Sequence, residues 1–157
     1  MRAIALGLLF LPALPFAYPE FQTFIANHSG RPVNCALCHT NDDGPEGRGP
    51  GQIGGLSPEG LAALGEARTA IHPGTAVASP ILNEFGNHII HAIGKLEFLS
   101  CLKNPFELSK KLPVNSDLDG DGIPDAREFL QGTHPLKPTD GNPWALFKHN
   151  LVRHWID

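Results

Sequence analysis

The segment NCALCHT, residues 34–40, brings two thiols and an imidazole together in the order C-x-x-C-H. Cys35, Cys38 and His39 in this spacing occur in three kinds of site: a covalent haem attachment, one half of a zinc site, and a redox dithiol. A plain disulfide between the two cysteines is a fourth possibility in an exported protein, but it leaves the histidine without a role. Each kind of site needs different partners, so the rest of the chain decides among them.

The first residues of the chain have the layout of an export signal. A positive charge precedes a short apolar run, and Ala17 offers a small residue before Tyr18, so residues 1–17 are predicted to be a signal peptide. Pro15 stands where a second small residue is expected, which leaves the exact cleavage position open. The apolar run is short for a membrane span, and an uncleaved anchor is the alternative. We therefore expect a periplasmic or secreted protein with no transmembrane segment after cleavage.

Composition indicates a folded domain and argues against one class of partner. The 157 residues are 41% hydrophobic and 18% charged, with a formal net charge of −4, a balance typical of globular proteins. No basic cluster occurs along the chain, so nucleic-acid binding is not expected. Glycine and proline gather between Thr40 and Gly60, where a long helix cannot form, and we expect an ordered functional loop there. The oligomeric state is left open.

Helical periodicity and helix caps dominate the remaining pattern, and no alternating strand pattern is convincing. The expected fold class is therefore mainly α, with long Gly/Pro loops. After the signal peptide, we divide the chain into a main helical domain over 18–112, an acidic loop with its helix over 113–136, and a C-terminal amphipathic helix over 137–157. The expected helices are Glu20–Asn27, Pro58 to about Ala70, a longest helix from Ser79 through Leu96, Pro105–Leu112, Pro124–Gln131 and one that begins at Asn142.

The rest of the chain favours a haem site over the alternatives. A structural zinc site needs a second pair of ligands, yet Cys101 is the one further cysteine. A thioredoxin-like dithiol lies between a strand and a helix, and no such pattern surrounds Cys35. Cys101 follows an apolar run and is expected to be a buried, unreactive thiol.

The motif, together with the export signal, resembles that of a c-type cytochrome. The resemblance implies one haem bonded to Cys35 and Cys38, with His39 as an axial ligand of the iron. It also implies a small helical cytochrome c-like domain over residues 18–112. Such a protein carries single electrons between redox partner proteins. The resemblance therefore favours an electron-transfer protein over an enzyme.

The group that faces His39 across the iron is less well defined by the sequence. The single methionine, Met1, leaves with the signal peptide, so the thioether ligand of many small cytochromes c is not expected. His88 shares a helix flank with apolar residues and is the main candidate for the second axial ligand, and His28 is a weaker one. The alternative is an open iron, which would favour peroxidase-like or gas-binding activity.

The second motif is the acidic segment DLDGDGIPDARE, residues 117–128. Carboxylates at loop positions 1, 3, 5, 9 and 12, with glycine at position 6, follow the calcium pattern of an EF-hand. Pro124 lacks the backbone N–H through which paired EF-hands join, so the loop resembles a thrombospondin type 3 repeat more closely. A non-catalytic calcium-dependent binding module is a further alternative. The predicted ligands of one structural Ca²⁺ are Asp117, Asp119, Asp121, the Ile123 carbonyl, Asp125 and Glu128.

Overall fold

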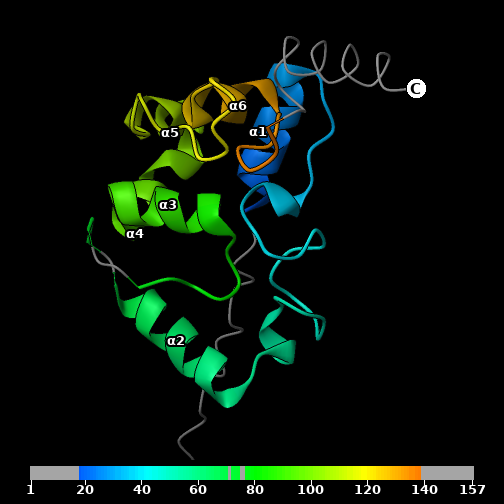
Figure 1. Cartoon of the computed structure of the whole chain (residues 1–157), viewed down its shortest axis with the longest axis vertical. Coiled ribbons are helices and arrows are strands. Elements are labelled where there is room, and N and C mark those ends of the chain that lie inside the picture. The colour runs from blue at the N-terminus through cyan, green and yellow to red at the C-terminus, as the bar shows by residue number, and fades with distance from the viewer. Residues whose placement is uncertain (1–17, 71, 75–76, 139–157) are drawn as a thin grey trace, which may run out of the picture.

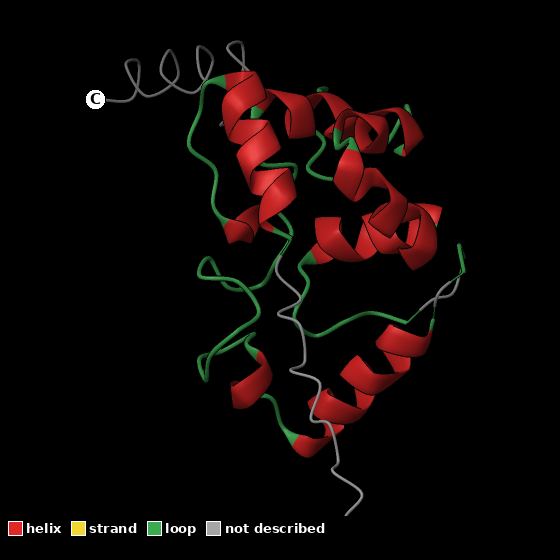
Figure 2. Cartoon of the chain, turned by 180° about the vertical axis from the view of Figure 1, so that it is seen from behind, coloured by secondary structure: helices red, strands yellow, loops and turns green. Residues whose placement is uncertain are grey.

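The computed structural model describes residues 18–70, 72–74 and 77–138, which form helices joined by long loops (Figures 1 and 2). These residues contain six α-helices, three 3₁₀-helices and no strand, although an isolated bridge joins His39 and Leu82. The expected mainly helical fold is confirmed over this part of the chain. The predicted signal peptide and the helix predicted from Asn142 lie outside the described residues. None of the described helices is long and apolar enough to cross a membrane.

The helix ends follow local sequence signals in most cases. The helices are α1 (Pro19–Ser29), α2 (Pro58–Thr69), α3 (Glu84–Ile93), α4 (Lys95–Ser100), α5 (Phe106–Lys111) and α6 (Asp125–Gln131). The Ser57 hydroxyl accepts a hydrogen bond from the Gly60 N–H (3.2 Å) and caps α2, as expected from the Ser-Pro start. Gly30 and Gly132 end α1 and α6 in the left-handed conformation, with φ of 71° and 66°. The predictions for α1, α2, α5 and α6 are therefore close to the observed helices.

The start predicted for the longest helix is wrong. Ser79 followed by proline has the form of a helix cap, but α3 begins at Glu84. Asn83 takes the capping position instead, because its Oδ1 accepts a hydrogen bond from the Gly86 N–H (2.8 Å). Residues 79–82 form a turn that ends in the bridge to His39, so they are used for a long-range contact that the local sequence does not reveal.

The same predicted helix is also interrupted before its end. Gly94 has φ of 78° and ψ of 155°, a conformation that is open to glycine and costly for other residues. The chain therefore turns between α3 and α4. As a result, Phe85, Ile89 and Ile93 on α3 are buried, whereas Leu96 beyond the turn is 59% exposed.

The hydrophobic core lies where α1, α3, α5 and α6 meet. Figure 1 shows α1, α5 and α6 at one end of the molecule, α3 and α4 beside them, and α2 at the opposite end. Phe85 and Phe129 are 0% exposed, and Phe129 on α6 lies edge-on to Phe21 on α1 with ring centroids 6.3 Å apart. The helix after the acidic loop is thus part of the same core as α1. Cys101 is also buried there (1% exposed), as predicted.

Candidate functional site

The C-x-x-C-H segment folds into a short 3₁₀ turn, Cys35–Leu37. The Asn34 side chain accepts a hydrogen bond from the N–H two residues on (3.1 Å), and the His39 N–H donates to the Cys35 carbonyl (2.8 Å). Neither Cys35 nor Cys38 is in a disulfide. Both cysteines and the histidine line one cavity, so the turn brings their side chains to the same space.

The His39 imidazole is held in the form that binds a metal. Its Nδ1 lies 3.0 Å from the Ile81 carbonyl oxygen. A carbonyl only accepts hydrogen bonds, so Nδ1 carries the proton and Nε2 keeps its lone pair. Burial lowers the pKa of His39 below its ordinary value, although the bond to Ile81 opposes this shift. The ring is therefore neutral at pH 7, which is the state that can ligate iron.

Segment 79–83 is hydrogen-bonded to the backbone on both sides of this imidazole as well as to the ring. The Thr40 N–H donates to the Ile81 carbonyl (3.3 Å), and the Thr40 hydroxyl donates to the Pro80 carbonyl (3.1 Å). The Asn83 N–H donates to the Cys38 carbonyl (3.1 Å). The backbone on both sides of His39 is therefore tied to the segment that accepts its Nδ1 proton.

Two asparagines, Asn83 and Asn87, hold this segment in place. Asn83 Nδ2 donates to the Ala36 carbonyl (2.7 Å) and the Leu37 carbonyl (3.1 Å), while its Oδ1 caps α3. Asn87 Nδ2 donates to the Ser79 carbonyl (3.2 Å), and its Oδ1 accepts from the Ser79 N–H (2.7 Å). An asparagine before Glu-Phe-Gly is a capping signal that could have located Asn83. No local signal links either residue to the cysteines.

The cavity beside the turn is mostly apolar. The cavity opens to solvent and has a volume of about 190 Å³, which is more than a single metal ion fills. Burial raises the pKa of the Cys38 thiol to about 12. Burial, followed by the nearby Asp43 and Asp42 carboxylates, raises the pKa of the Cys35 thiol. Apolar walls come from Phe21, Ile25, Leu64, Ile81, Ile90 and Phe98, among others.

The structure does not bring the predicted second iron ligands to this cavity. His88 Nε2 lies 3.0 Å from the Ser116 Oγ, next to the acidic loop. The His28 ring stacks on Phe24, with centroids 5.5 Å apart and planes at 11°. Among the described residues that line the cavity, His39 is the only histidine and methionine does not occur. The position opposite His39 therefore needs another group or stays open.

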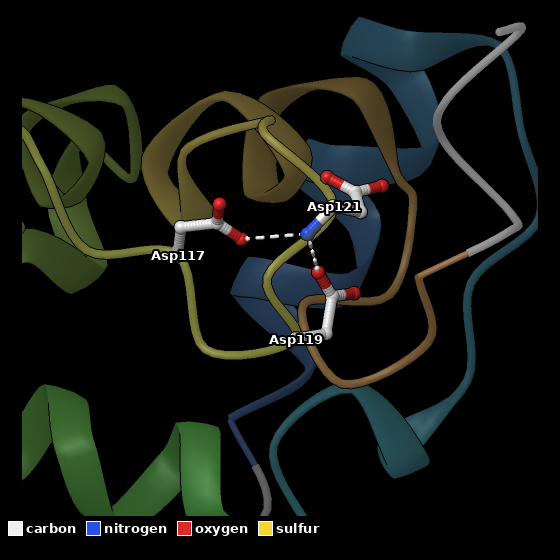
Figure 3. Close-up of side chains that lie close together, drawn as sticks. All are labelled: Asp117, Asp119 and Asp121. Carbon is white, nitrogen blue, oxygen red and sulfur yellow. Dashed lines mark hydrogen bonds between the residues drawn. The ribbon is translucent and has the colours of Figure 1, made fainter. Parts of the chain in front are cut away.

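The acidic loop gathers three of the six predicted calcium ligands. Oxygen atoms of Asp117, Asp119 and Asp121 lie within 4.8 Å of one another (Figure 3). The Asp121 N–H donates to Asp117 Oδ1 (3.2 Å) and to Asp119 Oδ1 (3.1 Å), and the Ile123 N–H donates to Asp121 Oδ1 (2.7 Å). Asp119 Oδ2 is buried and accepts no hydrogen bond. Burial and the neighbouring carboxylates raise the pKa of Asp119, so a cation here would relieve both effects.

The two predicted ligands on α6 bond to the surrounding chain. Asp125 is 0% exposed; its Oδ1 accepts from the Leu118 N–H (2.9 Å) and its Oδ2 accepts from the Ser116 hydroxyl. Glu128 is also 0% exposed, and its Oε1 accepts from the Thr133 hydroxyl (3.3 Å). Asp125 therefore braces the backbone of the loop, and the structure does not place it in the cluster of three carboxylates.

Comparison with known proteins does not identify a relative. No protein-family model, curated protein or solved structure matches the chain. The geometry of the cavity and of the acidic loop is therefore the basis for a functional assignment.

Proposed function

We propose that this protein is an exported monohaem c-type cytochrome that carries single electrons between redox partners. The observation that supports this most strongly is the arrangement of His39, whose Nδ1 is bonded to the Ile81 carbonyl and whose ring lines the same cavity as both thiols. In metal-binding histidines the second ring nitrogen almost always donates to a carbonyl, a carboxylate or water. The apolar walls of the cavity fit an apolar macrocycle better than a zinc ion.

Each residue of the site has a defined role toward a haem. The Cys35 and Cys38 thiols would bond its vinyl groups covalently, and His39 Nε2 would ligate its iron. The bond to Ile81 fixes the plane and the tautomer of the His39 ring. Haem held here supplies one-electron redox chemistry at its iron. The apolar walls would limit the access of water to a bound haem and so influence its potential.

The second candidate is a haem protein with an open iron and peroxidase-like or gas-binding activity. It is favoured by one observation: the described cavity wall offers no second histidine and no methionine. The zinc alternative is weaker because Cys101 is buried in the core and does not line the cavity. The dithiol alternative is weaker because burial raises the pKa of both Cys35 and Cys38, which disfavours the reactive thiolate. A calcium-dependent binding module would leave the oriented imidazole of His39 unexplained.

The decisive measurement is whether the chain carries covalently attached haem. The chain is expressed in a host that exports it and attaches haem, and the pyridine haemochrome spectrum is recorded after denaturation. We expect covalent haem in the wild type and in Cys101→Ala, and none in the double variant Cys35→Ala/Cys38→Ala. A wild type without covalent haem would refute the cytochrome. A low-spin oxidised spectrum favours the electron carrier, and a high-spin spectrum favours the open iron.

We also propose that the acidic loop binds one Ca²⁺ as a structural element. Its support is the cluster of three carboxylates and the buried Asp119 Oδ2, which accepts no hydrogen bond. A single exported loop of this type binds calcium with a Kd on the order of 10⁻⁴–10⁻³ M. The helix α6 follows the loop directly and buries Phe129 in the core, so an ion here would fasten α6 to α1.

Thermal unfolding with calcium or with a chelator tests this site. At about 10 mM Ca²⁺ the expected stabilisation is about 1.4–2.7 kcal/mol, which raises the melting temperature by roughly 5–10 °C. Asp119→Asn should lose most of this increase, whereas Glu66→Gln, an exposed charge on α2, should retain it. An equal calcium effect in both variants would argue against the site. A large change of haem potential on chelation would argue against a purely structural role.

A further inference from the structure

Lys95 lines the same cavity as the His39 imidazole. Its Nζ donates a hydrogen bond to the Arg68 carbonyl (3.2 Å), in the last turn of α2. The ammonium group thus connects α4 to α2 across the edge of the cavity. Lys95 is partly exposed and this contact lies at the surface, so the amine reaches solvent as well as the cavity.

The helix α3 runs along the cavity from the C-x-x-C-H turn toward Lys95. At its start, Gly86 is so close to the turn that an added Cβ would lie 2.2 Å from the Cys38 carbonyl oxygen. Gly86 and Ile90 line the cavity, and Lys95 follows directly after the turn at Gly94. The rise of an α-helix makes the distance from Gly86 to the end of α3 about 10 Å along the axis. The histidine and the lysine therefore belong to opposite ends of one cavity wall.

Other polar side chains on the wall are poorer iron ligands. Gln22, Asn34 and Asn87 carry amides, whose nitrogen atoms have no basic lone pair for a metal. The Tyr18 ring packs edge-on against Phe98 with centroids 5.5 Å apart. Burial raises the pKa of the Tyr18 phenol, so its ligating phenolate form is disfavoured. A lysine amine, once deprotonated, has a strongly basic nitrogen lone pair on a flexible four-carbon stem.

We propose that Lys95 Nζ is the second axial ligand of the iron, opposite His39. The inference rests on the proposed haem site and names the group that completes it. For Lys95 to ligate, its ammonium group gives one proton to solvent and leaves the Arg68 carbonyl, and the nitrogen lone pair then forms the bond to iron. Iron and a proton compete for the same lone pair, so the six-coordinate form gains population as the pH rises.

The test compares oxidised haem-loaded protein carrying Lys95→Arg, Lys95→Met or Lys103→Met with the wild type. Arginine keeps the positive charge and a donor for the Arg68 carbonyl, but it does not lose its proton at accessible pH. Lys103 is exposed and does not line the cavity, so it is the matched control. We expect low-spin wild type and Lys103→Met at about pH 8, and high-spin iron in both Lys95 variants. Acidification should convert the wild type to the high-spin form that the Lys95 variants show throughout.

The outcomes separate this inference from the haem assignment. A low-spin Lys95→Arg protein with covalent haem would overturn the lysine ligand and leave the haem assignment intact. A wild type with high-spin iron and covalent haem would have the same two consequences. If Tyr18→Phe alone becomes high-spin, the tyrosine holds the position and the inference is wrong. Absence of covalent haem overturns both proposals. Circular dichroism of each variant checks the fold, and Lys95→Arg decides the question if Lys95→Met does not fold.

Discussion

Replacing Asn83 by alanine should destabilise the fold and loosen the C-x-x-C-H turn in one step. Its Nδ2 donates to the Ala36 and Leu37 carbonyls, and its Oδ1 accepts from the Gly86 N–H. The helix cap is worth about 1 kcal/mol, and each partly buried carbonyl that loses its donor costs about 1 kcal/mol more. Allowing for water at the part-exposed sites, we expect a loss of about 2.5 kcal/mol. For a domain of this size this lowers the melting temperature by about 10 °C.

Urea unfolding of the haem-free protein measures this loss, and the haemochrome spectrum measures the yield of attached haem. Asn83→Asp keeps the acceptor for the Gly86 N–H but places a carboxylate oxygen against two carbonyl oxygens, so its loss should be at least as large as that of Asn83→Ala. The control is Asn104→Ala, whose Nδ2 makes one long, exposed contact to Glu107 (3.4 Å) and should cost under about 0.5 kcal/mol. A loss below about 1 kcal/mol in Asn83→Ala, with normal haem yield, would show that this side chain does not join the turn to α3.

Three further outcomes follow from the site. Gly86→Ala should cost about 1–3 kcal/mol of stability and reduce haem yield several-fold, because the added Cβ would lie 2.2 Å from the Cys38 carbonyl oxygen. Gly65→Ala, whose Cβ would have nothing within 4 Å, should cause neither loss. Similar losses in both variants would refute the close contact. In the haem-free protein, iodoacetamide at about pH 8 should modify Cys35 before Cys38, because a pKa of about 12 keeps Cys38 a thiol; equal rates by mass spectrometry would contradict this. In the haem-free protein the pKa of His39 is lowered by the fold, so the unfolded chain binds that proton first and the unfolding free energy should fall below about pH 6.5. His39→Gln should flatten this slope, and an unchanged slope would show that other groups cause it.

The helix ends that depend on neighbouring residues could be predicted from the sequence. Ser57 before Pro58 starts α2 because a hydroxyl cap and a proline at the first position need only local geometry. Gly132 ends α6 for the same kind of reason, since glycine adopts the left-handed conformation at little cost. The three aspartates of the acidic loop lie close together because a spacing of two residues in a tight turn brings them there.

Features that depend on distant residues could not be predicted in this way. Ser79 and Pro80 have the same local form as Ser57 and Pro58, yet they do not start a helix, because this segment serves as the acceptor for His39 and Thr40 from 40 or more residues away. His88 shares a helix flank with apolar residues, as expected of an iron ligand. The periodicity of a helix does not say, however, which other segment of the chain packs against that flank. In the structure that neighbour is Ser116, on the segment before the acidic loop.

Together with the hydrogen bonds of Asn83, this contact attaches α3 to two different parts of the chain. At its start Asn83 holds the turn that carries the cysteines, and at its middle His88 bonds Ser116, whose hydroxyl donates to Asp125 at the start of α6. The Ser116 hydroxyl uses its hydrogen atom in the hydrogen bond to Asp125, so the His88 Nε2–H must be the donor in the hydrogen bond to Ser116. All of these bonds lie within the chain and need no metal ion. Removing calcium should therefore lower the stability of the loop and α6 while α3, and with it the geometry around His39, keeps its attachments.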